Sequence, residues 1–362
     1  AQINTLIFKP RARKYDNTLQ AALDGTEVPE SVYHSLIEAV HDNMGYMYKY
    51  VKLRKKLLGL DELHMYDLYT PIVPDSDVKV PFEEAWKEVY ESLAPMGEDY
   101  RDIFKTGLRQ HWIDIYENEG KRSGAYSAGA RVHPFVLLNY KDTLDSEFTL
   151  AHEMGHAIHS YLSNKEQPVC YSDYVIFVAE VASTCNESLL MQSLLKKTTD
   201  KKRRAYLINY FLEQFRTTLY RQTMFAEFEL MINRKAESGE SLTADAMCEM
   251  YRGLNKLYYG DDIVIDSEID MEWARIPHFY YNYYVYQYAT GFSAAIALSE
   301  RILNEGGKAV KDYIGFLSSG SSADPITLLK GAGVDMTSKQ PVADALALFN
   351  RLIDELEGLM SN

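Results

Sequence analysis

The residues Thr149-Leu-Ala-His-Glu-Met-Gly-His-Ala-Ile-His-Ser160 indicate the fold and the chemistry more strongly than any other stretch of this chain. They contain three of its nine histidines, with His152 and His156 four residues apart and Glu153 directly after the first. Residues at i and i+4 of an α-helix project from consecutive turns of one face. If this stretch is helical, the two imidazoles can therefore meet on one zinc ion.

Two stripes of side chains run along the predicted helix from Thr143 onward. The first is apolar or small and predicts a face packed against a core: Leu144, Phe148, Ala151, Gly155, Ile158 and Leu162. The second lies beside it and is polar: Asp145, Thr149, His152, His156, His159 and Ser163. A polar stripe next to a buried one lies at the edge of the core, so we expect a cleft to reach the histidines. The alternative is a surface helix without metal.

Zinc held by three side chains keeps a fourth position open for water, lowers the pKa of that water towards 7 and polarises a scissile carbonyl. Glu153 points about 100° away from His152 around the helix, so it can reach the water without being a ligand. We expect Glu153 to act as a general base that takes the proton and passes it to the leaving amine. The predicted cofactor is one Zn²⁺ per chain.

The third ligand has to come from outside this helix. A metzincin would have Gly and His at positions 159 and 162, where this chain has His159 and Leu162. Glu180 lies among apolar and small residues in a second predicted helix, where an unpaired carboxylate is costly to bury. We therefore predict Glu180 as the third ligand. Glu187, two turns further along the same face, is a candidate partner for a ligand histidine, with a solvated helix position as the alternative.

The composition excludes several other classes of protein. The chain has 362 residues, 46% of them hydrophobic, and 38 Lys and Arg against 52 Asp and Glu give a net charge of −14. The acidic balance disfavours a nucleic-acid partner, because phosphates require a basic surface. No apolar run approaches the ~18 residues of a membrane span, and no export signal is visible, so we expect a cytoplasmic protein without a membrane partner.

The hydrophobic pattern predicts a mainly α protein with one small sheet. Glycines interrupt short apolar and aromatic stretches between residues 120 and 140, which predicts two or three short strands there. The proline-punctuated stretch 71–81 is the clearest linker candidate. The predicted helices are 29–58, 82–93, 98–116, 143–163, 174–196, 201–237, 243–259, 272–304 and 340–358.

The chain resembles oligoendopeptidase F, of the thimet oligopeptidase group of zinc peptidases, over most of its length. Besides Thr149–Ser160, the residues that carry this resemblance are Gly59-Leu-Asp-Glu-Leu-His-Met-Tyr-Asp-Leu-Tyr69, Gly120-Lys-Arg-Ser-Gly-Ala-Tyr126, Pro134-Phe-Val-Leu-Leu-Asn-Tyr140, Ala179-Glu-Val-Ala-Ser183, Ile276-Pro-His-Phe-Tyr280 and Tyr284-Val-Tyr-Gln-Tyr-Ala-Thr-Gly291. The resemblance implies a zincin-like helical catalytic lobe with a small β-sheet beside the active-site helix. It also implies a deep channel that admits short peptides and excludes folded proteins.

By the same resemblance, His152, His156 and Glu180 are metal ligands and Glu153 is the general base. It further implies that His278, Tyr281 and Tyr284 bind the substrate or its transition state. The tyrosine-rich run around them contains more hydroxyl groups than a core can satisfy, so we expect about half of them to line a wet channel, with aromatic core packing as the alternative. We expect an edge strand in 120–140 to pair with the substrate backbone, with a purely structural hairpin as the alternative.

Members of this family are considerably longer, with a further helical lobe before the point that matches Ala1. We therefore expect residues 1–115 to be a helical segment packed on the catalytic core and residues 116–362 to form the zinc-peptidase region. The predicted function is zinc-dependent endopeptidase cleavage of short oligopeptides. One alternative is a metal- and peptide-binding fragment that is inactive without the family's N-terminal lobe, which is then a candidate partner of this chain. The other alternative is an exopeptidase on the same scaffold.

Overall fold

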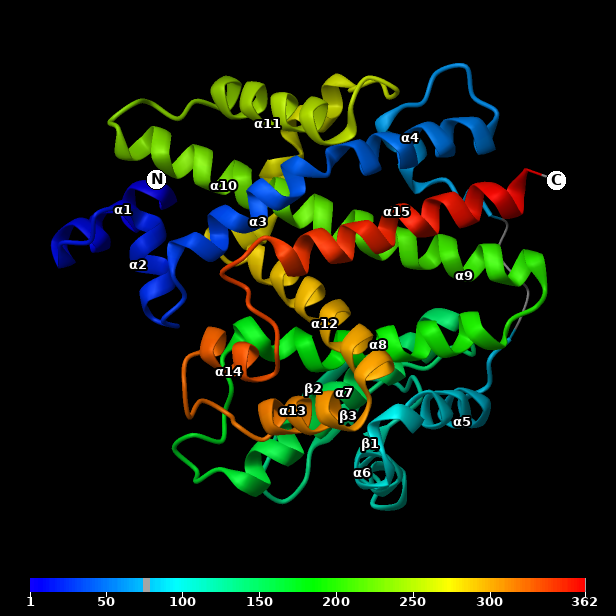
Figure 1. The fold of residues 1–362 in the computed structure, drawn as a ribbon. Coiled ribbons are helices and arrows are strands. Elements are labelled where there is room, and N and C mark those ends of the chain that lie inside the picture. Colours follow the sequence, from blue (N-terminus) through cyan, green and yellow to red (C-terminus); the bar gives the residue numbers. More distant parts are fainter. Residues whose placement is uncertain (74–78, 362) are drawn as a thin grey trace. The chain divides into compact units, whose positions relative to one another are not determined.

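The computed structural model describes residues 1–73 and 79–361, and it confirms a mainly α fold with one small sheet (Figure 1). Contacts divide the chain into two compact units. Unit 1 holds the described residues of 1–75, 208–290 and 337–362, and unit 2 holds those of 76–207 and 291–336. The division expected from the sequence, into residues 1–115 and 116–362, is not the same as this division by contacts. It stays a prediction.

Unit 2 contains the His152–His156 stretch. Its helices and strands are α5 (Phe82–Ser92), α6 (Glu98–Arg109), β1 (Ile113–Asp114), β2 (Tyr126–Ala128), β3 (Phe135–Leu137), α7 (Leu144–Glu166), α8 (Ile176–Lys197), the start of α9 (Lys201–Gln214), most of α12 (Tyr286–Glu305), α13 (Gly307–Leu317) and α14 (Pro325–Gly331). The Thr143 hydroxyl accepts the amide N–H of Ser146 and so caps the start of α7. Acidic residues in the first turn, Asp145 and Glu147, favour the same start.

The sheet lies beside α7. Its strand order is β1-β3-β2, with β1 parallel and β2 antiparallel to β3. Strand β2 packs on α7, and a side chain at Gly129, just after β2, would meet Ser160 of α7 at 2.9 Å. Among the described strands, β2 pairs with β3 on one side and with no strand on the other. The expected edge strand is therefore present next to the helix that carries the histidines.

Helices α7 and α8 make the closest helix pair of unit 2, and Gly155 explains how they approach. A β-carbon at position 155 would lie 2.6 Å from the Ser183 α-carbon and 2.7 Å from the Ala182 carbonyl oxygen of α8. The predicted apolar stripe of α7 is buried from Phe148 to Leu162. The sequence therefore predicted correctly which face of α7 packs against the core.

Unit 1 is an array of helices that includes both described ends of the chain. Its elements are α1 (Gln2–Arg13), α2 (Thr18–Asp24), α3 (Glu30–Asp42), α4 (Met44–Leu58), the end of α9, one turn of π-helix (Phe215–Tyr220), α10 (Arg221–Glu237), α11 (Ala244–Tyr259), the start of α12, α15 (Gln340–Met360) and 3₁₀ turns at Met65–Tyr69, Ser267–Arg275 and Pro277–Tyr280. The C-terminal α15 lies alongside α3 and α4 (Figure 1).

Three predicted helices are wrong in extent. The predicted helix 29–58 breaks at Asn43, whose side-chain amide donates to the Ala39 carbonyl and competes with the helical hydrogen bonds. The predicted helix 98–116 ends at Arg109, because the chain turns there and enters β1. The predicted helix 272–304 begins only at Tyr286, after 3₁₀ turns and a loop.

Four helices were not predicted from the sequence: α1, α2, α13 and α14. Part of the predicted linker, residues 74–78, lies outside the described residues. Among the helices that the structure describes, none has the length and apolar composition that crossing a membrane requires.

Candidate active site

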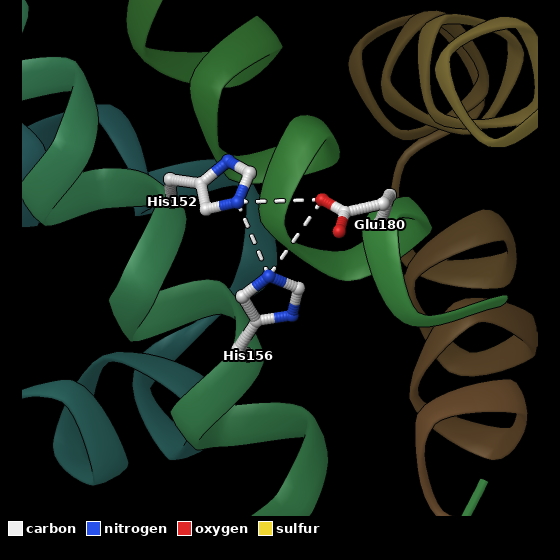
Figure 2. A group of neighbouring side chains, drawn as sticks. All are labelled: His152, His156 and Glu180. Atoms are coloured by element: carbon white, nitrogen blue, oxygen red, sulfur yellow. Dashed lines mark hydrogen bonds and ion pairs between the residues drawn. The ribbon is translucent and has the colours of Figure 1, made fainter. Parts of the chain in front are cut away.

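Two helices of unit 2 bring three potential metal ligands together (Figure 2). Helix α7 contributes His152 and His156, helix α8 contributes Glu180, and their ligand atoms all lie within 4.8 Å of one another. The His152 Nε2 atom lies 3.1 Å from His156 Nε2 and 3.3 Å from Glu180 Oε2, and the third side of the triangle is 3.7 Å. In this arrangement, both imidazoles and the carboxylate face a common point.

The donor set fits zinc. Ligand atoms about 2.0–2.2 Å from a tetrahedral zinc ion lie about 3.3–3.5 Å apart, close to the three distances found here. Two imidazole nitrogens and one carboxylate oxygen are ligands that zinc binds in catalytic sites, where a fourth position stays open. These residues can thus hold zinc with little rearrangement.

Glu187 orients one of the imidazoles. Its Oε1 atom lies 2.5 Å from His152 Nδ1, so that the Nδ1–H group donates to the carboxylate and Nε2 is left free to bind a metal. The residue lies on α8, about two helical turns after Glu180. The structure thus places Glu187 against a histidine of the candidate site, as the sequence suggested, and not on a solvated face.

Burial and neighbouring charges shift the pKa values of Glu180 and Glu153 in opposite directions. Burial opposes ionisation of Glu180, but the neighbouring histidines outweigh it and lower the pKa of its carboxyl well below the usual range. Burial raises the pKa of Glu153 to about 7, against a smaller opposing effect of His152. Glu153 is 7% exposed, and a carboxyl group with a pKa near 7 can accept and return a proton at neutral pH.

The pKa values of His152 and His156 are also shifted in opposite directions. Burial lowers the pKa of His152, but the carboxylates of Glu187 and Glu180 reverse this effect and raise it well above the ordinary value. Burial and the neighbouring charge of His152 lower the pKa of His156. A metal ion would displace the proton that the carboxylates favour on His152, so metal binding at this group releases protons.

The other predicted site residues, His278, Tyr281 and Tyr284, form a cluster within unit 1. The rings of Tyr281 and Tyr284 lie 6.2 Å and 5.8 Å from that of His278, and the two tyrosine rings are 6.1 Å apart. Tyr288 joins them, with its hydroxyl 3.5 Å from His278 Nε2. The structure therefore brings His278, Tyr281 and Tyr284 together as one aromatic group.

The family model of peptidase family M3 matches residues 4–348 of the chain. The chain belongs to this family. Its M3 relatives include oligopeptidase PepF of Bacillus subtilis, which is 52% identical over 98% of this chain and 53% of its own length. The oligoendopeptidase F homolog of Lactococcus lactis is 46% identical over 98% of this chain and 59% of its own.

The fold of this chain is also similar to that of a solved structure. Oligoendopeptidase-F from Enterococcus faecium superimposes with a TM-score of 0.81 and 39% identity over 99% of this chain and 58% of its own. These comparisons confirm the resemblance to oligoendopeptidase F. The chain spans between half and three fifths of the length of these relatives.

Two expectations about the surroundings of the candidate site are wrong. His159 and Ser163 were predicted at the edge of a cleft, but both are buried, because the segment after α7 covers this end of the helix: the His159 ring stacks on Tyr174 at 3.6 Å, and the Ser163 hydroxyl donates to the Ser172 carbonyl. The predicted tyrosine helix is also wrong, since Tyr280, Tyr281, Tyr283 and Tyr284 precede α12. Tyr283 is buried, whereas Tyr280 and Tyr281 are exposed.

Two residues that support Glu180 were not singled out from the sequence. The Ser183 hydroxyl donates to Glu180 Oε2 at 3.3 Å, which a spacing of three on a predicted helix could have indicated. Gly291 of α12 packs against the Glu180 β-carbon, where a side chain would come within 3.4 Å. No sequence pattern indicates this second contact, because it joins residues that are far apart in the chain.

Proposed function

We propose that the chain is a zinc-dependent endopeptidase that hydrolyses short oligopeptides. The observation that carries this proposal is the near-tetrahedral spacing of the His152, His156 and Glu180 donor atoms, with Glu153 on the same helix. Membership of peptidase family M3 and the names of the relatives, oligopeptidase and oligoendopeptidase F, support the reaction class and the short substrates.

In this proposal His152, His156 and Glu180 hold one zinc ion. Zinc in such a site acts as a Lewis acid on the scissile carbonyl and brings the pKa of a water molecule to about 7. Glu153 takes the proton of the attacking water and passes it to the leaving amine, and its raised pKa suits both steps. Glu187 keeps the His152 ring in the orientation that directs Nε2 towards Glu180.

Two further parts of the chain bind the peptide in this proposal. The unpaired edge of β2, next to α7, hydrogen-bonds to the substrate backbone as an added strand. The His278, Tyr281 and Tyr284 group supplies imidazole and phenol donors to the substrate or to the developing oxyanion. Location in the cytoplasm remains a prediction from the sequence.

The test is Glu153→Gln, assayed with internally quenched, end-blocked peptides and with metal analysis. We expect unchanged zinc content and a fall in kcat of about a hundredfold or more, because the glutamine cannot accept the proton. Glu166→Gln, an exposed position at the end of α7, is the matched control and should cleave like the wild type. Cleavage retained by Glu153→Gln would remove Glu153 from its proposed role.

Peptides of graded length separate the proposed endopeptidase from the alternatives. Chelator-sensitive cleavage inside short blocked peptides supports the proposal. Cleavage that requires a free terminus would instead identify an exopeptidase. Peptide binding without cleavage by a folded, zinc-loaded sample would favour a metal- and peptide-binding chain that needs a further lobe for turnover.

A further inference from the structure

The segment that leads into α12 contains two consecutive residues in the left-handed backbone region. Asn282 has φ 60° and Tyr283 has φ 52°. Asparagine tolerates this conformation, but for a bulky residue such as tyrosine it is an outlier, because the β-carbon approaches the carbonyl oxygen. A turn of this kind persists only where the surrounding structure holds it.

Helix α10 holds the backbone of this turn. Glu229 Oε1 accepts the Tyr283 amide N–H at 2.7 Å. One turn further along α10, the Asn233 amide donates to Asn282 Oδ1 at 3.2 Å and to the Glu229 carbonyl at 2.8 Å. Both left-handed residues are thus hydrogen-bonded to the same stretch of α10.

The Tyr283 side chain contacts α2 and α3. Its hydroxyl lies 3.0 Å from the Thr18 hydroxyl, and its ring packs edge-on against Tyr33 at 5.6 Å. Tyr283 is 3% exposed, while its neighbour Tyr281 is 69% exposed. The turn therefore points one tyrosine into unit 1 and leaves the neighbouring ones beside His278.

Glu229 is an unusual residue to find at the base of this turn. It is 1% exposed, and its Oε2 atom has no hydrogen-bond partner among the described residues. Burial raises the pKa of its carboxyl to about 8, against a smaller opposing effect of the Tyr283 amide. Burying a carboxyl group is costly, and here the group makes one strong contact, with the backbone of the strained residue.

We propose that Glu229 is a positioning residue that fixes the left-handed turn at Asn282 and Tyr283 and thereby orients Tyr281 and Tyr284 for the peptide substrate. The part of this proposal that concerns the turn uses contacts within unit 1 alone. Its consequence for catalysis rests on the proposed function of the chain.

The experiment compares Glu229→Leu, which removes the acceptor oxygen, with Glu229→Gln, which keeps one. Asn233→Ala is a second, milder variant that releases Asn282 and remains informative if Glu229→Leu does not fold. Tyr50→Phe is the matched control, because it removes a buried hydrogen bond of unit 1, to Glu213, that does not involve the turn. All variants are measured by hydrogen exchange at the Tyr283 amide and by kcat and KM on a short quenched peptide.

We expect Tyr283 amide exchange to be about tenfold faster in Glu229→Leu and close to wild type in Glu229→Gln and Tyr50→Phe, with α7 unchanged in all of them. We expect kcat of Glu229→Leu to fall at least about tenfold with a smaller change in KM, and Glu229→Gln to restore it. A loss of thermal stability in Tyr50→Phe without a loss of kcat would show that destabilisation alone does not produce the effect.

Two results would overturn the proposal. The first is wild-type exchange at Tyr283 in both Glu229→Leu and Asn233→Ala, which would mean that α10 does not hold the turn. The second is faster exchange with unchanged kcat and KM, which would mean that the turn does not orient residues used in catalysis. A wild-type chain that cleaves no peptide would contradict the proposed function instead, and the exchange measurement would still decide whether Glu229 holds the turn.

Discussion

Glu153 and Glu180 are both largely buried, yet their environments move their pKa values in opposite directions. Glu180 faces two imidazoles and stays ionised, whereas burial raises the pKa of Glu153 to about 7 because it outweighs the opposing charge of His152. Two titratable groups separated in this way suit different roles, one as a ligand and one as a proton carrier. The sequence predicted Glu153 as the base from its position after His152 and Glu180 as a ligand from its apolar surroundings, and these opposite pKa shifts support both predictions.

The contact between Glu187 and His152 leads to a prediction about metal affinity. We predict that Glu187→Leu weakens zinc binding about 10- to 100-fold, because the His152 ring loses the partner that orients it. Glu187→Gln should recover part of the loss, since its amide oxygen can accept the Nδ1–H group. Competition with a chromogenic chelator measures both, and Glu166→Ala serves as the control. Equal affinity of Glu187→Leu and the wild type would contradict an orienting role.

At the scale of elements, the α7–α8 contact depends on Gly155. We predict that Gly155→Ala destabilises unit 2 by about 1–3 kcal/mol and weakens zinc binding, because a β-carbon would overlap the α8 backbone. Gly253→Ala in α11 is the matched control, since a β-carbon there meets nothing within 4 Å and should stabilise the helix by about 0.5–1 kcal/mol. Urea unfolding and zinc titration measure both variants. Stabilisation by Gly155→Ala would mean that the helices can separate without cost.

Glu147 of α7 is a buried carboxyl group that the charge of Glu88 of α5 influences. Glu147 of α7 is fully buried, and both of its carboxyl oxygens lack a hydrogen-bond partner among the described residues, as does Glu88 Oε2 of α5. Burial and the charge of Glu88 raise the pKa of Glu147 well above the usual range, and Glu84 adds to the effect while Arg203 of α9 opposes it. Burial and the charge of Glu147 also raise the pKa of Tyr140. The folded chain therefore keeps a proton on Glu147 that the unfolded chain releases above about pH 4.5.

The raised pKa of Glu147 predicts that the free energy of unfolding falls as the pH rises. Because the folded state binds more protons than the unfolded state, the free energy of unfolding decreases above about pH 4.5 by up to about 1.4 kcal/mol per pH unit until Glu147 ionises in the folded state. Glu147→Gln should remove this contribution, so that it is more stable than the wild type at pH 8 and similar to it near pH 4.5. Urea unfolding across this range checks the prediction, with Glu166→Gln, an exposed position at the end of α7, as the control. Parallel pH profiles of Glu147→Gln and the wild type would contradict it.

At the scale of the whole molecule, the three proposed zinc ligands belong to unit 2, whereas the His278 cluster belongs to unit 1. Zinc that binds the folded state stabilises it by about 4 kcal/mol at a thousandfold excess over Kd. We therefore predict that chelation speeds amide exchange in α7 and α8 and leaves α3, α10 and α15 nearly unchanged. Hydrogen exchange with and without chelator measures this, and equal effects on both units would contradict zinc ligands that belong to unit 2 alone.

The sequence by itself determined the features that depend on local geometry. Helical periodicity predicted α7, α8 and the buried face of α7, and the spacing of four residues placed His152 and His156 on one side of α7, because both follow from backbone hydrogen bonds between neighbouring turns. The resemblance to oligoendopeptidase F, which the comparisons confirm, also rested on the sequence alone.

Only the tertiary structure decided features that join residues far apart in the chain. The left-handed turn before α12 is held by Glu229, 54 residues earlier than Tyr283, so no local pattern could show that the predicted helix 272–304 would start at Tyr286. The approach of Glu187 to His152 and the burial of His159 under Tyr174 likewise needed the packed chain. Local backbone sterics set the elements, whereas long-range contacts decide which side chains meet, because each contact depends on where the rest of the chain has folded.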